Sequence, residues 1–218
     1  MSFFEILQRE TEQERLHLLS APLINDSRCG KVTLNDYVAF LGQAYHHVKH
    51  TVPLLMAVGS RLPESKEWLR VAVAEYIEEE LGHQEWVLND IAACGFDKAA
   101  VRDSKPHTST ELMVSYAYDM VHRINPLGFF GMVHVLEGTS VSVADQAANG
   151  IREALALPRS AFTYLYSHGA VDQDHVQFFQ QQMDRIEAAE EQELIIHSAR
   201  VFYKLYGDIF RSLKPGAS

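Results

Sequence analysis

The residues with the clearest potential for chemistry are two histidines and an aspartate in one short segment of the last third of the chain. His168, Asp172 and His175 are spaced at i, i+4 and i+7. Each residue of an α-helix turns by about 100°, so on one continuous helix these side chains fall within roughly 60° of one another. Two imidazoles and a carboxylate on one stripe form half of a site for a first-row transition metal. The alternative is a polar helix face with incidental histidines, because the chain has 11 of them.

A second group of ligand-type residues lies in the acidic run that ends at Glu80 and is followed by His83. Glu80 and His83 have the Glu-x-x-His spacing by which di-iron helical bundles present two ligands from one helix. The spacing is common in acidic helices, so a solvated face is the alternative interpretation. Glu79, four residues before the histidine, is also geometrically compatible, and the first carboxylate is therefore either Glu79 or Glu80.

A third carboxylate, Glu137, stands in a strongly apolar segment. A carboxylate in such a segment lies at an edge facing water or is buried, and a buried one needs a partner. Its apolar neighbours are Phe129, Phe130, Met132, Val133, Val135 and Leu136.

Together the three segments supply three carboxylates and three imidazoles. Two Fe(II) ions carry four positive charges, which three carboxylates and a bridging hydroxide neutralise, and this balance suits a partly buried dinuclear site. The chain has only two cysteines, Cys29 and Cys94, and no Cys-x-x-Cys pair. A structural zinc site closed by thiolates is therefore disfavoured.

With these motifs the chain resembles the haem-oxygenase-like di-iron oxidases and oxygenases, within the superfamily of thiaminase II and the coenzyme PQQ synthesis protein. The resemblance covers most of the chain, from the histidine-rich segment 45–51 to the C-terminal helix, and the His-x3-Asp-x2-His run is its most specific part. It implies an all-α, haem-oxygenase-like bundle of about seven or eight helices in a single domain over residues 1–218. It also implies a homodimer.

The same resemblance implies a metal centre with two iron ions, for which manganese or zinc are alternatives. Some members place the first carboxylate seven residues before the histidine, which here is Tyr76, and others place it three before, which is Glu80. The implied activity is a non-haem, O2-dependent oxidase or oxygenase for a small organic substrate. The implied ligands are Glu80, His83, Glu137, His168, Asp172 and His175.

Six other residues are candidates for lining the pocket or orienting a ligand. His46 and His50 have i, i+4 spacing, with His47 between them. The ordinary interpretation of all six residues is core or surface packing. The six residues are Tyr45, His46, His50, Tyr76, Phe130 and His134.

Composition narrows the function further. The 218 residues are 47% hydrophobic and carry a net charge of −10 without a basic block, which disfavours nucleic acid as a partner. The N-terminus lacks a basic segment followed by an apolar one, and no run approaches about 18 apolar residues, so we expect no secretion signal and no membrane span. The expected location is the cytoplasm, with both cysteines reduced.

Periodicity and punctuation predict helices and no sheet. One long helix over residues 64–93 carries Glu80 and His83 well inside it, and another, from residue 126 to about 148, carries Glu137, with a bend expected near Gly138. The other predicted helices cover residues 2–19, 34–57 with a kink at Pro53, 109–123, 158–167, a segment reaching about 186, and 190–213.

Three other functions remain open at this stage. A metal-free hydrolase like thiaminase II needs a cysteine nucleophile with an activating carboxylate, and neither Cys29 nor Cys94 stands in a segment resembling such a site. A non-catalytic relative would bind a ligand or a protein, although it would have no reason to keep six ligand-type residues. Haem oxygenase activity would use a histidine as the axial ligand, which fits the carboxylate-rich set less well.

Overall fold

The computed structural model describes residues 1–170 and 172–213, and the side chains of residues 168–175 lie outside the described part. No strand occurs in these ranges, and the all-α expectation is confirmed. The α-helices are α1 (Phe3–Glu10), α2 (Glu12–Leu19), α3 (Pro22–Arg28), α4 (Leu34–Val48), α5 (Thr51–Arg61), α6 (Glu67–Glu80), α7 (His83–Ala93), α8 (Lys98–Arg102), α9 (Thr108–Asp119), α10 (Phe129–Leu155), α11 (Thr163–Ala170), α12 (Asp172–Met183) and α13 (Ala189–Ser212).

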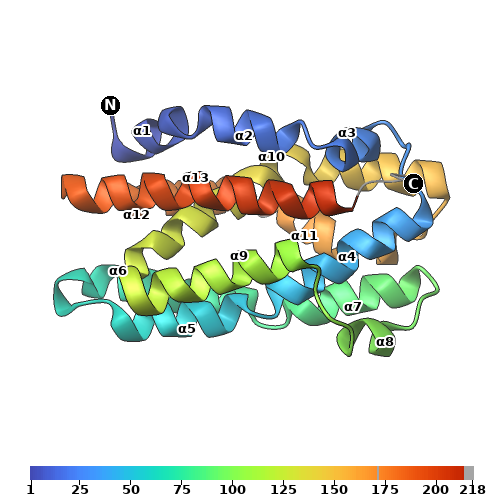
Figure 1. The fold of residues 1–218 in the computed structure, drawn as a ribbon, viewed down its shortest axis with the longest axis horizontal. Helices are drawn as coiled ribbons and strands as arrows, with labels where there is room; N and C mark the ends of the chain where they lie inside the picture. Colours follow the sequence, from blue (N-terminus) through green and yellow to red (C-terminus); the bar gives the residue numbers. More distant parts are fainter. Residues whose placement is uncertain (171, 214–218) are drawn as a thin grey trace.

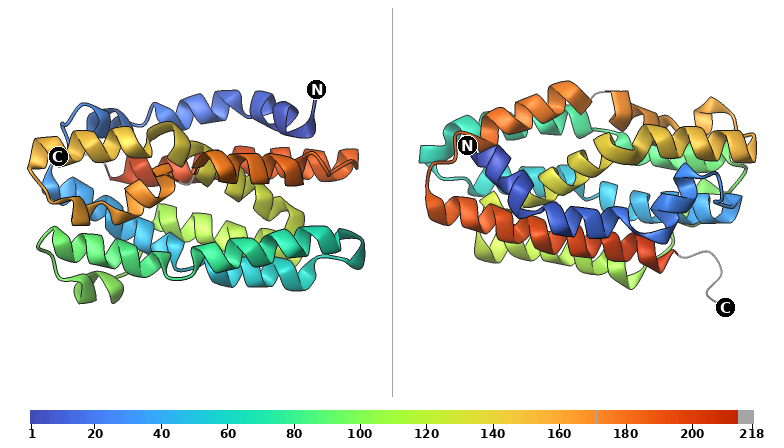
Figure 2. Two further views of the ribbon diagram at one scale, coloured as in Figure 1. Left: turned by 180° about the vertical axis from the view of Figure 1, so that it is seen from behind. Right: turned by 90° about the horizontal axis from the view of Figure 1, so that it is seen from above.

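Two long helices, α10 and α13, pack against each other and organise the bundle. Figure 1 shows α13 along the long axis of the molecule, with α1 and α2 on one side and α9 on the other. Helix α10 also packs against α3, α11 and α12, while α4 packs against α7 and α5 against α6. Seen from behind in Figure 2, α6 and α7 lie end to end along one side of the bundle.

The contact between α10 and α13 depends on a small residue. A Cβ atom added to Gly131 would lie 2.6 Å from the backbone nitrogen of Ala199 and 2.9 Å from the Cβ of Ser198. Only glycine therefore allows the two helices to come this close. Helix α10 is one continuous helix through Gly138, and the bend expected near that residue stays a prediction.

Helix α10 is also the most apolar long segment. Residues Pro126–Leu155, which include α10, are long and apolar enough to cross a membrane by length and composition alone. However, 56% of its most apolar 18-residue stretch is buried inside the bundle, where α10 packs against α13, α11 and α3. Packing in the core accounts for this composition.

The predicted helix over residues 64–93 is wrong, because it is two helices. Leu81 has an extended backbone and Gly82 has a φ of +93°, so α6 ends at Glu80 and α7 begins at His83. Glycine adopts this left-handed conformation at little cost, whereas a single glycine in a sequence pattern is equally compatible with a continuous helix.

Other predicted helices are also divided, which explains why the bundle has more helices than the expected seven or eight. Thr11 separates α1 from α2, and the predicted helix 34–57 breaks at Lys49 and His50 rather than at Pro53. Pro53 lies in the first turn of α5. A missing N–H has no consequence there, because the first N–H groups of a helix lack an intrahelical partner.

We predict that Gly82→Ala destabilises the protein. Nothing lies within 4 Å of a Cβ atom added to Gly82, so the cost comes from the left-handed backbone alone. It should lower the free energy of unfolding by about 1 kcal/mol or more and the melting temperature by about 2–4 °C. Gly82→Asn is the matched control and should lose less, because asparagine tolerates this conformation better than alanine. Equal losses in thermal melts would contradict this explanation.

Candidate metal centre

Seven helices meet around a cavity of about 280 Å³ that most of the described ligand-type residues line. Its walls come from the adjoining ends of α4 and α5, from α6, α7, α10, α11 and α13. The lining residues are His47, Val48, Thr51, Tyr76, Glu79, Glu80, His83, Trp86, Leu136, Glu137, Ser140, Tyr164, Ser167 and Tyr206.

Glu80 and His83 form a close pair at this cavity. The Oε2 atom of Glu80 lies 3.1 Å from Nδ1 of His83, and their side chains are 23% and 11% exposed. The His83 ring packs on Trp86, with 4.1 Å between ring centroids. The pair is therefore made across the turn at Gly82, with each residue at a helix end, and not from one helix face as the spacing suggested.

The buried hydroxyl of Tyr76 marks the point where carboxylates from two helices converge. Burial raises the pKa of Tyr76 well above its ordinary value. The carboxylates of Glu137, Glu79 and Glu80 raise the same pKa further, in that order of effect. Glu137 of α10 is thus brought together with the carboxylates at the end of α6, and Glu79 and Glu80 both border the cavity.

The described wall of this cavity is rich in carboxylates. Three carboxylates border it, and no lysine or arginine is among the described lining side chains. Carboxylates removed from bulk water need a cation or a set of hydrogen-bond donors nearby. Carboxylate oxygens combined with imidazole nitrogen suit iron, manganese or zinc, so the donor set fits a metal.

The residues of the His-x3-Asp-x2-His run lie at the junction of two helices. His168 belongs to α11, and Asp172 and His175 belong to α12, but their side chains are outside the described residues. Among the side chains that are described, no group of three His, Cys, Asp or Glu is placed to hold a metal ion. The predicted stripe of three ligands and the completed site therefore stay predictions.

Helix α11 nevertheless faces the cavity. Tyr164 and Ser167 both line it, and Ser167 directly precedes His168. Burial raises the pKa of Tyr164, and the neighbouring Tyr206 and Glu80 add to this effect. The start of α11 therefore lies beside the end of α6.

Asp90 is a site-supporting residue that the sequence analysis missed. It is fully buried on α7, and its two carboxylate oxygens accept the backbone N–H groups of Thr163 (3.0 Å) and Tyr164 (2.8 Å). These groups open α11 and have no intrahelical partner, so Asp90 caps that helix from a distance in sequence. Burial raises the pKa of Asp90, while these hydrogen bonds act against the rise. The signal was an aspartate within the apolar segment 87–91, comparable to that of Glu137.

Among the histidines of segment 45–51, the cavity is lined by His47, which is 2% exposed and packs edge-on against Tyr206. His46 and His50, the i, i+4 pair, are placed elsewhere. The Nε2 atom of His46 lies 2.9 Å from Oγ of Ser104, and burial lowers the pKa of His46 to about 4. His50 pairs through Nδ1 with the Tyr118 hydroxyl at 3.1 Å.

Of the other pocket candidates, Tyr76 lines the cavity, whereas Tyr45, Phe130 and His134 do not. The Tyr45 ring lies below the ammonium of Lys49, and Phe130 is fully buried in the core. His134 lines a separate cavity of about 150 Å³ that Glu137 also borders. There its Nε2 atom lies 3.3 Å from Oγ1 of Thr11.

Comparison with known proteins agrees with the fold and gives the chain a family. A family model described as iron-containing redox enzyme matches residues 38–207. The chain belongs to this family. Membership of this family associates the protein with iron in general. No curated protein matches the chain.

Solved structures with the same fold as this chain include the following three. A domain of unknown function with a haem-oxygenase-like fold, from Shewanella denitrificans, has TM-score 0.86 and 22% identity, with 98% of this chain and 92% of that chain covered. A TenA homologue from Pseudomonas syringae has TM-score 0.82 and 12% identity, covering 96% and 91%. Haem oxygenase-1 from Synechocystis, in complex with haem, has TM-score 0.75 and 13% identity, covering 98% and 93%. At these identities the likeness establishes the fold, which is haem-oxygenase-like.

We predict that Asp90→Ala destabilises the protein through α11. The substitution leaves the N–H groups of Thr163, whose hydrogen bond is partly buried, and Tyr164, whose hydrogen bond is buried, without their acceptor, and this should cost about 2 kcal/mol. Asp97→Ala is the matched control, because Asp97 caps the short α8 at an exposed position, where water replaces the lost acceptor. Chemical denaturation should give a clearly larger loss for Asp90→Ala, and equal losses would contradict the capping role.

We also predict that the metal-free protein loses stability in mild acid because of His134. Burial, with a smaller effect of Arg15, lowers the pKa of His134 to about 4, against about 6.5 when unfolded. Between these values the unfolded chain binds more protons, so stability falls as the pH falls from about 6.5 to 4, by at most about 3 kcal/mol.

The measurement is urea unfolding at several pH values for the native chain and for His134→Gln. The variant should show a weaker pH dependence, because the group that protonates only on unfolding is gone. His197→Gln, at an exposed position on α13, should leave the dependence unchanged. An unchanged slope in His134→Gln would show that other groups cause the acid sensitivity.

Proposed function

We propose that this protein is a non-haem di-iron enzyme, an O2-dependent oxidase or oxygenase that acts on a small organic substrate. The observation that carries the proposal is the convergence of carboxylates from α6 and α10 with His83 of α7 on one cavity that has no described cationic side chain in its wall. Membership of an iron-containing redox family supports iron as the balancing cation.

In this proposal Glu80 and His83 hold iron from the junction of α6 and α7, and Glu137 holds it from α10. His168, Asp172 and His175 complete the set from α11 and α12. Glu80 is preferred to Glu79 as the first carboxylate, because Glu80 is the residue paired with His83 and is less exposed than Glu79. Bound iron would supply the activation of O2, and manganese or zinc remain alternatives for the same donors.

The chain's own residues prepare the cavity for a small molecule. The raised pKa values of Tyr76 and Tyr164 keep both hydroxyls protonated, so they are available as hydrogen-bond donors at the cavity wall. The ring of Trp86 and the side chains of Val48 and Leu136 supply apolar surface that limits water. A volume of about 280 Å³ is at the small end of ligand sites, which favours a small substrate.

A metal-free hydrolase like thiaminase II is the second candidate, and the similarity to TenA structures favours it. A thiol nucleophile needs a lowered pKa and access to the pocket. Cys94 is buried, which raises the pKa of its thiol to about 11, and Cys29 is exposed. Neither lines the cavity, so the cysteines favour the iron enzyme. A non-catalytic ligand-binding relative is a third candidate. We expect a cytoplasmic homodimer in each case.

We predict that Glu80→Ala loses iron, whereas Glu78→Ala retains it. The two carboxylates are neighbours in sequence, but Glu80 borders the cavity and pairs with His83, while Glu78 is exposed and does not border it. Elemental analysis after anaerobic loading with Fe(II) measures the retained metal. The native chain should hold about two ions. Glu137→Ala and His168→Ala should hold fewer.

Glu79→Ala distinguishes the two candidates for the first carboxylate. Loss of iron in Glu79→Ala but not in Glu80→Ala would assign the role to Glu79. If the native chain retains no iron, the proposal fails. Cys94→Ser, tested for hydrolysis in the presence of a chelator, would then examine the second candidate.

A further inference from the structure

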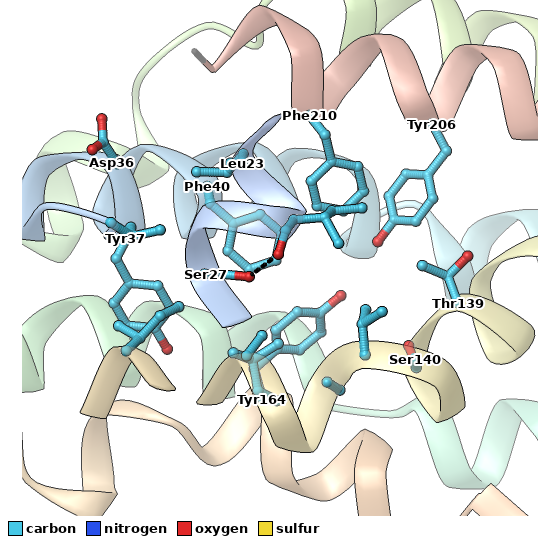
Figure 3. Close-up of a pocket in the computed structure, with 17 residues that line it drawn as sticks. Leu23, Ser27, Asp36, Tyr37, Phe40, Thr139, Ser140, Tyr164, Tyr206 and Phe210 are labelled. Carbon is cyan, nitrogen blue, oxygen red and sulfur yellow. Dashed lines mark hydrogen bonds between the residues drawn. The ribbon is translucent and has the colours of Figure 1, made fainter. Parts of the chain in front are cut away.

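A narrow apolar cavity lies directly beside the candidate metal centre. It has a volume of about 60 Å³ and is lined mainly by aliphatic and aromatic side chains from α3, α4, α10, α11 and α13. Ser140, Tyr164 and Tyr206 line both cavities. Figure 3 shows the hydroxyls of Tyr164 and Tyr206 directed toward one another, with Thr139 and Ser140 beside them. These residues form a polar boundary between an apolar space and a carboxylate-rich one.

One face of α10 forms the long wall of the apolar cavity. Its residues recur at helical spacing from Thr139 to Ile151, a span of about 18 Å along the helix axis. Ala144 and Ala147 stand in the middle of this face and are buried, and their small side chains leave the space that larger ones would fill. The cavity therefore exists because this stretch of the core is built with alanine.

Aromatic rings hold the opposite wall in place. The Tyr37 hydroxyl donates a hydrogen bond to the carbonyl oxygen of Ala161 at 2.7 Å. Its ring stacks on Phe40, which stacks on Phe210, and Phe210 packs edge-on against Tyr206. Rings fixed in this way cannot collapse into the space, because each is already in contact with its neighbours.

We propose that this cavity binds a small nonpolar gas molecule, O2, next to the metal centre. An apolar cavity offers water few hydrogen-bond partners, and one of about 150 Å³ stays dry and binds benzene or xenon. The cavity here is less than half that size, so it suits a diatomic molecule better than an organic ring. The role of O2 rests on the proposed function, whereas the gas site is a property of the chain without metal.

Xenon is the probe for the site, and the metal-free protein with labelled methyl groups is the sample. Xenon should shift the methyl resonances of Leu23, Ile24 and Val143, which line the cavity. Ala144→Leu fills the space and should abolish these shifts. Ala74→Leu makes the same change at an exposed position on α6 and should keep them. If Ala144→Leu does not fold, Ala144→Val adds less volume and should weaken the shifts.

The second measurement is the initial rate of O2 uptake by the Fe(II)-loaded chain. Ala144→Leu should slow it severalfold with the iron content unchanged, and Ala74→Leu should match the native rate. Absence of xenon shifts in the native chain would overturn the proposal. Unchanged O2 uptake in Ala144→Leu would also overturn it, and would point to an apolar part of the substrate as the occupant. Loss of the proposed function appears separately, as a native chain that shifts with xenon but retains no iron.

Discussion

The structure depends on gathering several carboxylates around one cavity of an otherwise apolar bundle. Glu79, Glu80 and Glu137 border one cavity whose described wall has no lysine or arginine. Carboxylates placed close together in a medium of low dielectric repel one another and lose hydration, so they persist only with a compensating positive charge. In a member of an iron-containing redox family, a metal is the natural source of that charge.

Rigid connections around the cavity hold these groups in place. The left-handed turn at Gly82 brings Glu80 and His83 together, although they belong to different helices. On the same helix as His83, about two turns later, Asp90 fixes the start of α11. One helix, α7, therefore links the end of α6 to the segment that leads to His168. The close contact at Gly131 ties α10, and with it Glu137, to the long axis of the bundle.

The sequence predicted features that depend on residue type alone. It was less informative about features that depend on backbone conformation or on the direction of a side chain. Composition and periodicity predicted an all-α fold, and a carboxylate in an apolar segment drew attention to Glu137, which borders the cavity. The pair of Glu80 and His83 was predicted for the wrong reason, since spacing cannot distinguish a helix from a turn with one left-handed glycine. His47 rather than His46 or His50 faces the cavity, because the direction of a helix face depends on packing partners distant in sequence. The position of Asp90 among apolar residues marks it as a buried carboxylate, but the sequence does not show which backbone groups it accepts from.

The arrangement of the two cavities follows from the same physical constraint. Charged groups require a polar, cation-holding compartment, whereas a nonpolar gas favours an apolar one, and no single lining satisfies both. Helix α10 meets both requirements by changing character along its length: Glu137 and Ser140 border the carboxylate-rich cavity, and Ala144 and Ala147 border the apolar one. The hydroxyls of Tyr164 and Tyr206 lie at the boundary between the two cavities. Because both compartments share one continuous helix, the packing of α10 against α13 and α11 positions a wall of each cavity at once.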